Sequence, residues 1–182
     1  YDYADRVVAA VEGAATPLIV VAQSMSAFTA VIVAERIPVD ELVLVAPMIP
    51  APGESAAQWW SNVGQEAAQR AQAAADGRDP DAPTDIRELF FHDVPAGVVA
   101  DAFAREEPRL SDAAFEPSWS AERWPAVPVR VVAGRRDRLF PLPFMVRVTR
   151  ERLGIDVQTV DSGHLPALAR PEELAALLLE ST

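Results

Sequence analysis

Two short apolar runs with a helical segment between them constrain the fold of this chain most. Residues 17–22 (PLIVVA) and 42–45 (LVLV) are rich in β-branched side chains, as strands buried on both faces are. Between them, residues 25–36 show helical spacing and end before Pro38. A strand, a helix and a second strand in this order predict a βαβ unit, with a parallel sheet and a right-handed crossover.

The same alternation returns near the end of the chain. We expect strands over residues 129–133 and 156–160, each followed by a helix, over 143–153 and 171–180. Gly154 closes the first of these helices and a proline opens the second, in agreement with the usual end signals. The sequence therefore predicts an α/β fold with a mostly parallel sheet flanked by helices.

The middle of the chain, residues 51–124, has weaker sheet character. Residues 54–76 are predicted to be helical, with an Ala-rich second half, and residues 95–105 form a further helix. Residues 86–94 (IRELFFHDV) are compatible with a short strand or a short helix. We expect this stretch to be a mainly helical insertion into the sheet domain.

The composition excludes several kinds of chemistry. The chain has 182 residues, enough for one domain with a sizeable core, and its net charge of -11 argues against nucleic acid and anionic membranes as partners. There is no cysteine and no lysine, which excludes thiolate, Schiff-base and phosphate-loop chemistry. Two histidines, His92 and His164, are too few for a His-rich metal site, so we expect no metal and no cofactor.

Three polar residues follow directly after predicted strands. Ser24, Asp137 and His164 come after the strands that end at Ala22, Ala133 and Val160. Open parallel sheets place their sites at this edge, and the order Ser, Asp, His is the one associated with the α/β-hydrolase architecture.

These residue types suit nucleophilic catalysis. A serine hydroxyl is a poor nucleophile at neutral pH and needs a base, for which imidazole is well matched. A carboxylate fixes the imidazole tautomer and stabilises the imidazolium that forms. At a sharp turn after Ser24, the backbone N–H of Met25 would face a developing oxyanion.

Each residue also has a simpler interpretation. Ser24 could be an ordinary helix N-cap, and Ser26 offers a rival hydroxyl. Asp137 could be a loop carboxylate paired with a neighbouring arginine, and Asp161 is a rival acid close to His164 in the sequence. His92 could be a structural residue whose ring is simply hydrogen-bonded. The combination of all three residues, in order and at strand ends, favours the triad.

Several stretches of the chain resemble the α/β-hydrolase superfamily, in particular its small methylesterase and hydroxynitrile lyase branch. They are VVAQSMSAFTA, LVLVAPMIPAPGES, FFHDVP, VRVVAGRRDRLFPL and DSGHLPALARPEELAALLLE, and they span almost the whole chain. The resemblance implies a hydrolase core formed by residues 1–50 and 125–182, with residues 51–124 as a cap over the pocket. It also implies that Ser24 is the nucleophile, His164 the base and Asp137 the acid.

The sequence departs from the family pattern at two places. Glycines usually flank the nucleophile at the elbow, whereas Ala22 and Ser26 stand here, and Gln23 replaces a common histidine. Only 23 residues precede Ser24, fewer than the strands of the family need, so the loop that donates a second oxyanion N–H has no counterpart. Since the chain also begins at Tyr1 without a methionine, we expect it to be part of a longer product, with apolar sheet edges left uncovered.

The expected function is cofactor-independent hydrolysis of an ester of a small, largely apolar substrate through an acyl-enzyme. A hydroxynitrile lyase is an alternative, although that activity usually uses a pocket lysine; a ligand-binding relative with a vestigial triad is another. We expect a cytoplasmic protein by default, and the oligomeric state is left open. The candidate pocket walls, for which core packing is an equally good interpretation, are Met25, Met48, Trp59, Trp60, Phe90, Phe91 and Trp119.

Overall fold

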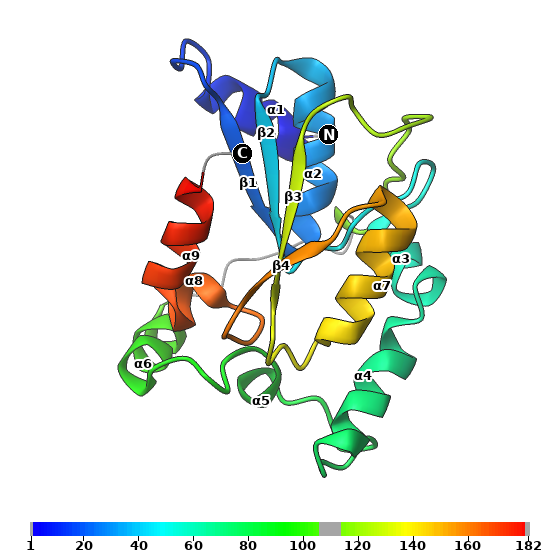
Figure 1. Ribbon diagram of the computed structural model, residues 1–182, viewed down its shortest axis with the longest axis vertical. Coiled ribbons are helices and arrows are strands. Elements are labelled where there is room, and N and C mark those ends of the chain that lie inside the picture. Colours follow the sequence, from blue (N-terminus) through cyan, green and yellow to red (C-terminus); the bar gives the residue numbers. More distant parts are fainter. Residues whose placement is uncertain (1, 106–113, 181–182) are drawn as a thin grey trace.

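The computed structural model describes residues 2–105 and 114–180. Its centre is a sheet of four parallel strands in the order β1-β2-β3-β4 (Figure 1). The strands are β1 (Ile19–Gln23), β2 (Glu41–Val45), β3 (Val129–Gly134) and β4 (Val157–Val160). Each predicted strand is thus present within one or two residues of its expected bounds, and the predicted α/β fold is confirmed.

The crossovers place the ends of all four strands at one edge. The 3-10 turn η1 (Ser24–Ser26) and α2 (Ala27–Arg36) lead from β1 to β2, and α7 (Leu142–Leu153) leads from β3 to β4. In the register of the sheet, Gln23 lies beside Val45 and Gly134 beside Val160. The loops that follow β1, β3 and β4 therefore leave the sheet at the same edge, with β2 between the first and the other two.

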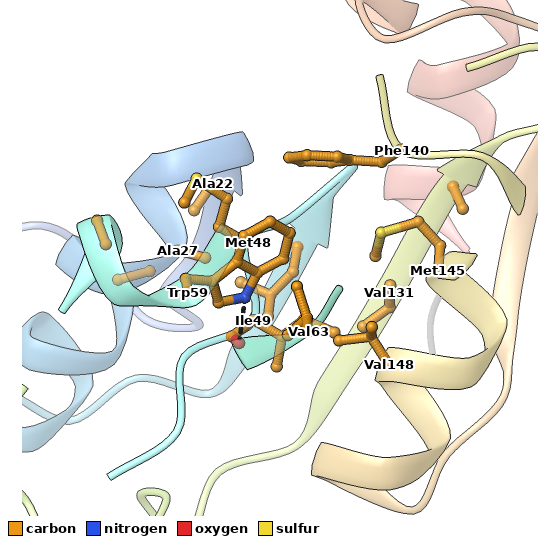
Figure 2. Close-up of a cluster of buried hydrophobic side chains, with 14 of the residues drawn as sticks. Ala22, Ala27, Met48, Ile49, Trp59, Val63, Val131, Phe140, Met145 and Val148 are labelled. Atoms are coloured by element: carbon orange, nitrogen blue, oxygen red, sulfur yellow. Dashed lines mark hydrogen bonds between the residues drawn. The ribbon is translucent and has the colours of Figure 1, made fainter. Parts of the chain in front are cut away.

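The main hydrophobic core lies between one face of the sheet and the helices α2, α7 and α3 (Ala56–Asn62). Trp59 of α3 lies in the middle of this group and donates a hydrogen bond of 2.9 Å from its indole N–H to the Ile49 carbonyl (Figure 2). The opposite face of the sheet is covered by α9 (Pro171–Leu179), whose Leu174 is buried. Residues packed in the main core include Ala22, Ala27, Leu42, Leu44, Met48, Val131, Phe140, Phe144, Met145 and Val148.

The segment between β2 and β3 is helical, as predicted, but it is more divided than the sequence suggests. The helical stretch predicted over residues 54–76 consists of two helices: α3 ends before Val63, and α4 (Gln65–Ala75) begins after Gly64. Gly64 adopts a left-handed conformation with φ of 64°, which breaks the helical path. Ser55 caps α3 by accepting a hydrogen bond from the Gln58 N–H.

Residues 86–104 of this segment lie beyond the carboxyl ends of the strands (Figure 1). The uncertain stretch at residues 86–94 contains a short helix, α5 (Ile86–Phe90), and the helix expected next is α6 (Ala96–Ala104). In Figure 1, α4, α5 and α6 lie at the bottom of the view, where β3 also ends. This arrangement brings α5 close to the loops that follow β3 and β4.

At the other end of the sheet order, β1 pairs with β2 alone among the described strands. Its outward side chains Ile19 and Val21 are 43% and 50% exposed, in line with the expectation of an uncovered apolar edge. The remaining helices are α1 (Asp2–Ala10), which packs on α2, and the short α8 (Pro166–Ala169). Over the described residues, none of the helices has the length and apolar character that a membrane span needs.

Candidate active site

Ser24 stands at a strained corner between β1 and η1. Its φ of 53° lies in the left-handed region, which is uncommon for a residue other than glycine and costs about 1–2 kcal/mol. The Ser24 carbonyl accepts a hydrogen bond of 3.0 Å from the Met48 N–H in the loop after β2, which helps to hold this conformation. Strain of this kind is often found at functional sites.

The rival hydroxyl, Ser26, serves the backbone of the same corner. It accepts a hydrogen bond from the Gln23 N–H at 2.8 Å and donates one to the Gln23 carbonyl at 2.7 Å. The N-cap positions of η1 and α2 are occupied by Gln23 and Ser26, so Ser24 is not the helix cap that a serine in this place would ordinarily be.

Asp137 and His164 form a buried pair. The Oδ2 atom of Asp137 lies 2.8 Å from Nδ1 of His164, and both side chains are 1% exposed. The other carboxylate oxygen, Oδ1, accepts the backbone N–H groups of Leu139 at 2.8 Å and Phe140 at 2.9 Å. Asp137 is therefore neither a free loop carboxylate nor the partner of a neighbouring arginine.

The His164 ring is enclosed by aromatic edges. The rings of Phe90 and Phe140 lie 5.1 and 5.0 Å from it in edge-to-face geometry. Its Nε2 atom is buried and has no hydrogen-bond partner among the described residues. The Gln23 side-chain amide donates a 2.8 Å hydrogen bond to the His164 carbonyl, so the corner after β1 is tied directly to the histidine loop.

Close backbone approach explains the glycine that precedes Asp137. A Cβ atom at Gly134 would lie 2.5 Å from the carbonyl oxygens of Ser162 and Gly163. A side chain there would push apart the loops that carry Asp137 and His164. The glycine therefore allows the two loops to lie against each other.

The other polar candidates lie beside the pair rather than in it. Asp161 is 57% exposed and forms an ion pair of 3.0 Å with Arg136, so Asp137 and not this rival acid is the partner of His164. The Nε2 atom of His92 lies 3.0 Å from the Arg136 carbonyl. Burial lowers the pKa of His92, and the nearby charge of Arg138 adds to this effect.

Comparison with known proteins gives the family. Residues 1–177 match the profile described as "Alpha/beta hydrolase family". The chain belongs to the alpha/beta hydrolase family. No curated protein sequence matches it.

Several solved structures have a fold similar to that of this chain. Polyneuridine aldehyde esterase is similar with a TM-score of 0.72 and 17% identity over 98% of this chain and 78% of that one. An extracellular alpha/beta-hydrolase from a Paenibacillus species has a TM-score of 0.69 and 16% identity, covering 97% of this chain and 77% of its own. Tomato methylketone synthase I, complexed with 2-tridecanone, has a TM-score of 0.68 and 19% identity over 98% and 76% of the two chains. At these identities the likeness establishes the fold.

Three of the aromatic and methionine side chains predicted as pocket walls belong to the main hydrophobic core. Met48, Trp59 and Trp119 are 1%, 0% and 1% exposed. Trp59 packs on Phe140 with ring centroids 5.1 Å apart, and the Trp119 indole donates a 3.0 Å hydrogen bond to Glu35. Core packing, the alternative interpretation, accounts for these three residues.

The remaining candidates lie nearer to the surface. Phe90 contacts the His164 ring, and Trp60 is partly buried with its ring 5.8 Å from Phe140. Phe91 packs instead on Phe103 of α6, at 5.1 Å. Met25 is also partly buried and packs against the main core.

Sequence reasoning missed three contacts of the histidine loop. Gln23 was noted only as the replacement of a common histidine, yet its side-chain amide donates a hydrogen bond to the His164 carbonyl. Phe140 was not singled out, although it follows Asp137 closely enough in sequence to reach the same ring. Asp93 accepts the Gly163 N–H at 2.7 Å, and its only sequence signal was its place in the FFHDVP stretch.

A surface hollow of about 560 Å³ lies apart from this pair, between α4, the loop at residues 79–85 and α5. Its lining is strongly charged and includes Arg70, Arg78, Asp81 and Arg138. Within the described ranges, no group of three or more His, Cys, Asp or Glu side chains is placed to hold a metal ion.

Proposed function

We propose that this protein is a serine hydrolase that cleaves an ester of a small, largely apolar substrate. In this proposal Ser24 is the nucleophile, His164 the general base and Asp137 the acid that orients it. The observation that carries the proposal is the buried 2.8 Å hydrogen bond between Asp137 and His164 Nδ1, together with a His164 Nε2 atom that has no hydrogen-bond partner in the part of the chain that the structure describes. The strained Ser24 corner leaves the sheet at the same edge.

The electrostatics of the pair suit a base. Because two backbone N–H groups occupy Oδ1 of Asp137, the carboxylate is held in place and presents Oδ2 to His164. A carboxylate at Nδ1 keeps the proton on that nitrogen and leaves the lone pair of Nε2 available. Burial among aromatic rings strengthens the interaction of Asp137 with the imidazolium formed during the reaction.

The proposed reaction has two halves. The Ser24 hydroxyl oxygen attacks the carbonyl carbon while its proton passes to Nε2 of His164, and the Met25 N–H donates to the developing oxyanion. The tetrahedral intermediate collapses, the bond to the alcohol breaks, and the alcohol leaves with the proton from His164. Water then gives a proton to the same nitrogen and attacks the acyl carbon; the bond to the Ser24 oxygen breaks, His164 returns the proton to that oxygen, and the acid leaves.

The surroundings of His164 favour an apolar substrate. Phe90 and Phe140 present their rings beside the base, and an apolar wall is what a small ester with little polar surface requires. Since Phe90 comes from α5, we propose that residues 51–124 act as a cap, with residues 1–50 and 125–182 as the hydrolase core. The names of two of the similar structures, an esterase and an extracellular alpha/beta-hydrolase, agree with this class of reaction.

A fluorophosphonate probe with intact-mass analysis tests the proposal. We expect one covalent adduct on the wild-type protein and none on Ser24→Ala or His164→Ala. Ser26→Ala is the matched control, because it removes the neighbouring hydroxyl, and it should still be labelled. A panel of short-chain 4-nitrophenyl esters and methyl esters should be hydrolysed by the labelled forms only.

The same experiment separates the alternatives. A folded wild-type protein that is neither labelled nor active on esters would be a ligand-binding relative, and the serine hydrolase proposal would fail. Cleavage of a cyanohydrin without ester hydrolysis would indicate the lyase activity instead. Labelling that persists in Ser24→Ala and disappears in Ser26→Ala would identify Ser26 as the nucleophile in place of Ser24.

A further inference from the structure

A buried carboxylate from the segment between β2 and β3 holds the backbone beside His164. Asp93 follows α5, and its side chain is 4% exposed. Its Oδ2 atom accepts the N–H of Gly163, the residue directly before His164, at 2.7 Å. A distance this short is typical of a charge-assisted hydrogen bond.

The contact between Asp93 and the histidine loop is closely fitted. A Cβ atom at Gly163 would lie 2.7 Å from Nε2 of His92 and 2.8 Å from Oδ1 of Asp93. The backbone of the loop therefore rests directly against these two side chains. Any larger residue at Gly163 would displace the loop, the His92–Asp93 pair, or both.

Burying the Asp93 carboxylate costs free energy, and its hydrogen bond from the Gly163 N–H offsets that cost only in part. Its Oδ1 atom is buried and has no hydrogen-bond partner among the described residues. The Arg136 guanidinium, 42% exposed, approaches Oδ2 to 3.7 Å, which is too far for a hydrogen bond. A buried carboxylate with one unpaired oxygen contributes little to stability, which points to a role at the neighbouring site.

We propose that Asp93 is a positioning residue for His164, acting through the Gly163 N–H; this inference rests on the proposed hydrolase function. The His164 ring is held by Asp137 and its carbonyl by Gln23. Asp93 fixes the peptide on the other side of the residue, so the imidazole cannot pivot away from the carboxylate. Phe90 lies in the same short segment as Asp93. This one segment therefore both hydrogen-bonds the backbone next to His164 and packs an aromatic ring against the His164 imidazole.

Variants at this position test the inference by kinetics. Asp93→Ala removes the acceptor and should lower kcat for a 4-nitrophenyl ester by about 10- to 100-fold, with KM changed by less than about twofold, since a small displacement of the base affects the chemical step most. Asp93→Asn keeps an oxygen that can accept the Gly163 N–H and should restore most of kcat. Asp156→Ala, which removes an exposed carboxylate paired with Arg150, is the matched control and should behave as wild type.

Histidine NMR supplies a readout that does not depend on turnover. The chain has only two histidines, so the Cε1–H signals are assigned with His92→Gln. We expect the His164 signal to shift or broaden in Asp93→Ala and to keep its position in Asp156→Ala. If the wild type has no hydrolase activity, this measurement still decides whether Asp93 positions His164, while the proposed function fails by itself.

Two results would overturn the inference. One is an Asp93→Ala variant with wild-type kcat and an unchanged His164 signal. The other is equal loss of kcat in the Ala and Asn variants, because charge and not the hydrogen bond would then matter. Should Asp93→Ala fail to fold, hydrogen exchange of glycine-labelled wild-type protein decides: the Gly163 amide must be protected, and rapid exchange there would refute the contact.

Discussion

Replacing Asp137 with asparagine is the sharpest test of the proposed triad. The two side chains have nearly the same shape, and the amide oxygen of asparagine can still accept the N–H groups of Leu139 and Phe140. The amide nitrogen then takes the place of Oδ2 and faces Nδ1 of His164 as a donor. To accept that bond, Nδ1 must lose its proton, and the proton moves to Nε2.

The size of the effect follows from this change of tautomer. With a proton already on Nε2, His164 cannot take one from Ser24, and the imidazolium has lost its counter-charge. We expect kcat to fall by about 10⁴-fold, which corresponds to about 5.4 kcal/mol of transition-state stabilisation. Because Asp137→Asn preserves the hydrogen bonds to the backbone, the variant should remain folded.

The assay is steady-state hydrolysis of a 4-nitrophenyl ester, with Ser24→Ala as the background and circular dichroism as the check of folding. The loss should appear in kcat more than in KM, because the substrate does not contact Asp137 in the proposed mechanism. A folded Asp137→Asn variant with turnover within tenfold of wild type would refute the reasoning. Another group would then have to orient His164, although Asp161, its nearest rival in sequence, is engaged with Arg136.

Three further changes test the packing and electrostatics around the site. Trp59→Ala should lower the free energy of unfolding by about 3–5 kcal/mol in urea titrations, because it empties the centre of the core; a loss below 1 kcal/mol would contradict that placement. Arg152→Ala should cost about 3–5 kcal/mol in the same assay, since it leaves Glu54 buried without the guanidinium that donates to its two oxygens at 2.5 and 2.9 Å, and Glu54→Gln in that background should recover part of the loss. The lowered pKa of His92 means that the unfolded chain binds its proton first, so stability should fall as the pH drops below about 6.5. Thermal unfolding of His92→Gln should show a flatter pH dependence there, and an unchanged slope would exclude this cause.

The sheet could be predicted because the strand at its centre, β2, is buried on both faces. Runs such as Leu42 to Val45 consist of apolar residues alone, and all four are fully or almost fully buried. A strand buried on both faces consists of a continuous apolar run, which can be identified in the sequence without knowing which strands it pairs with. The order of residues at strand ends then predicted the meeting of Asp137 and His164, and the register that pairs Gly134 with Val160 produces it.

Features that depend on contacts between distant segments could not be predicted in the same way. The break between α3 and α4 depends on the left-handed conformation of Gly64. The sequence alone does not show whether a glycine within an otherwise helical stretch adopts a helical or a left-handed conformation. Aromatic residues were equally ambiguous: Trp59 and Phe90 both read as apolar, yet one fills the core and the other contacts His164. Only the packing of the segment between β2 and β3 against the sheet distinguishes them.

The corner at Ser24 shows that a sharp strand-to-helix turn can form without glycines at its flanks. Glycines at the flanks usually allow the strand and the helix to approach closely. Here Ala22 is small enough to be buried in the core, with 5% of its surface exposed. Ser26 adds what a glycine could not, because its hydroxyl bonds both the N–H and the carbonyl of Gln23 and so braces the corner. The left-handed backbone strain is carried by Ser24 itself and does not depend on glycine at either flank. What the corner requires of its neighbours is small size and satisfied backbone groups, and Ala22 and Ser26 meet both requirements.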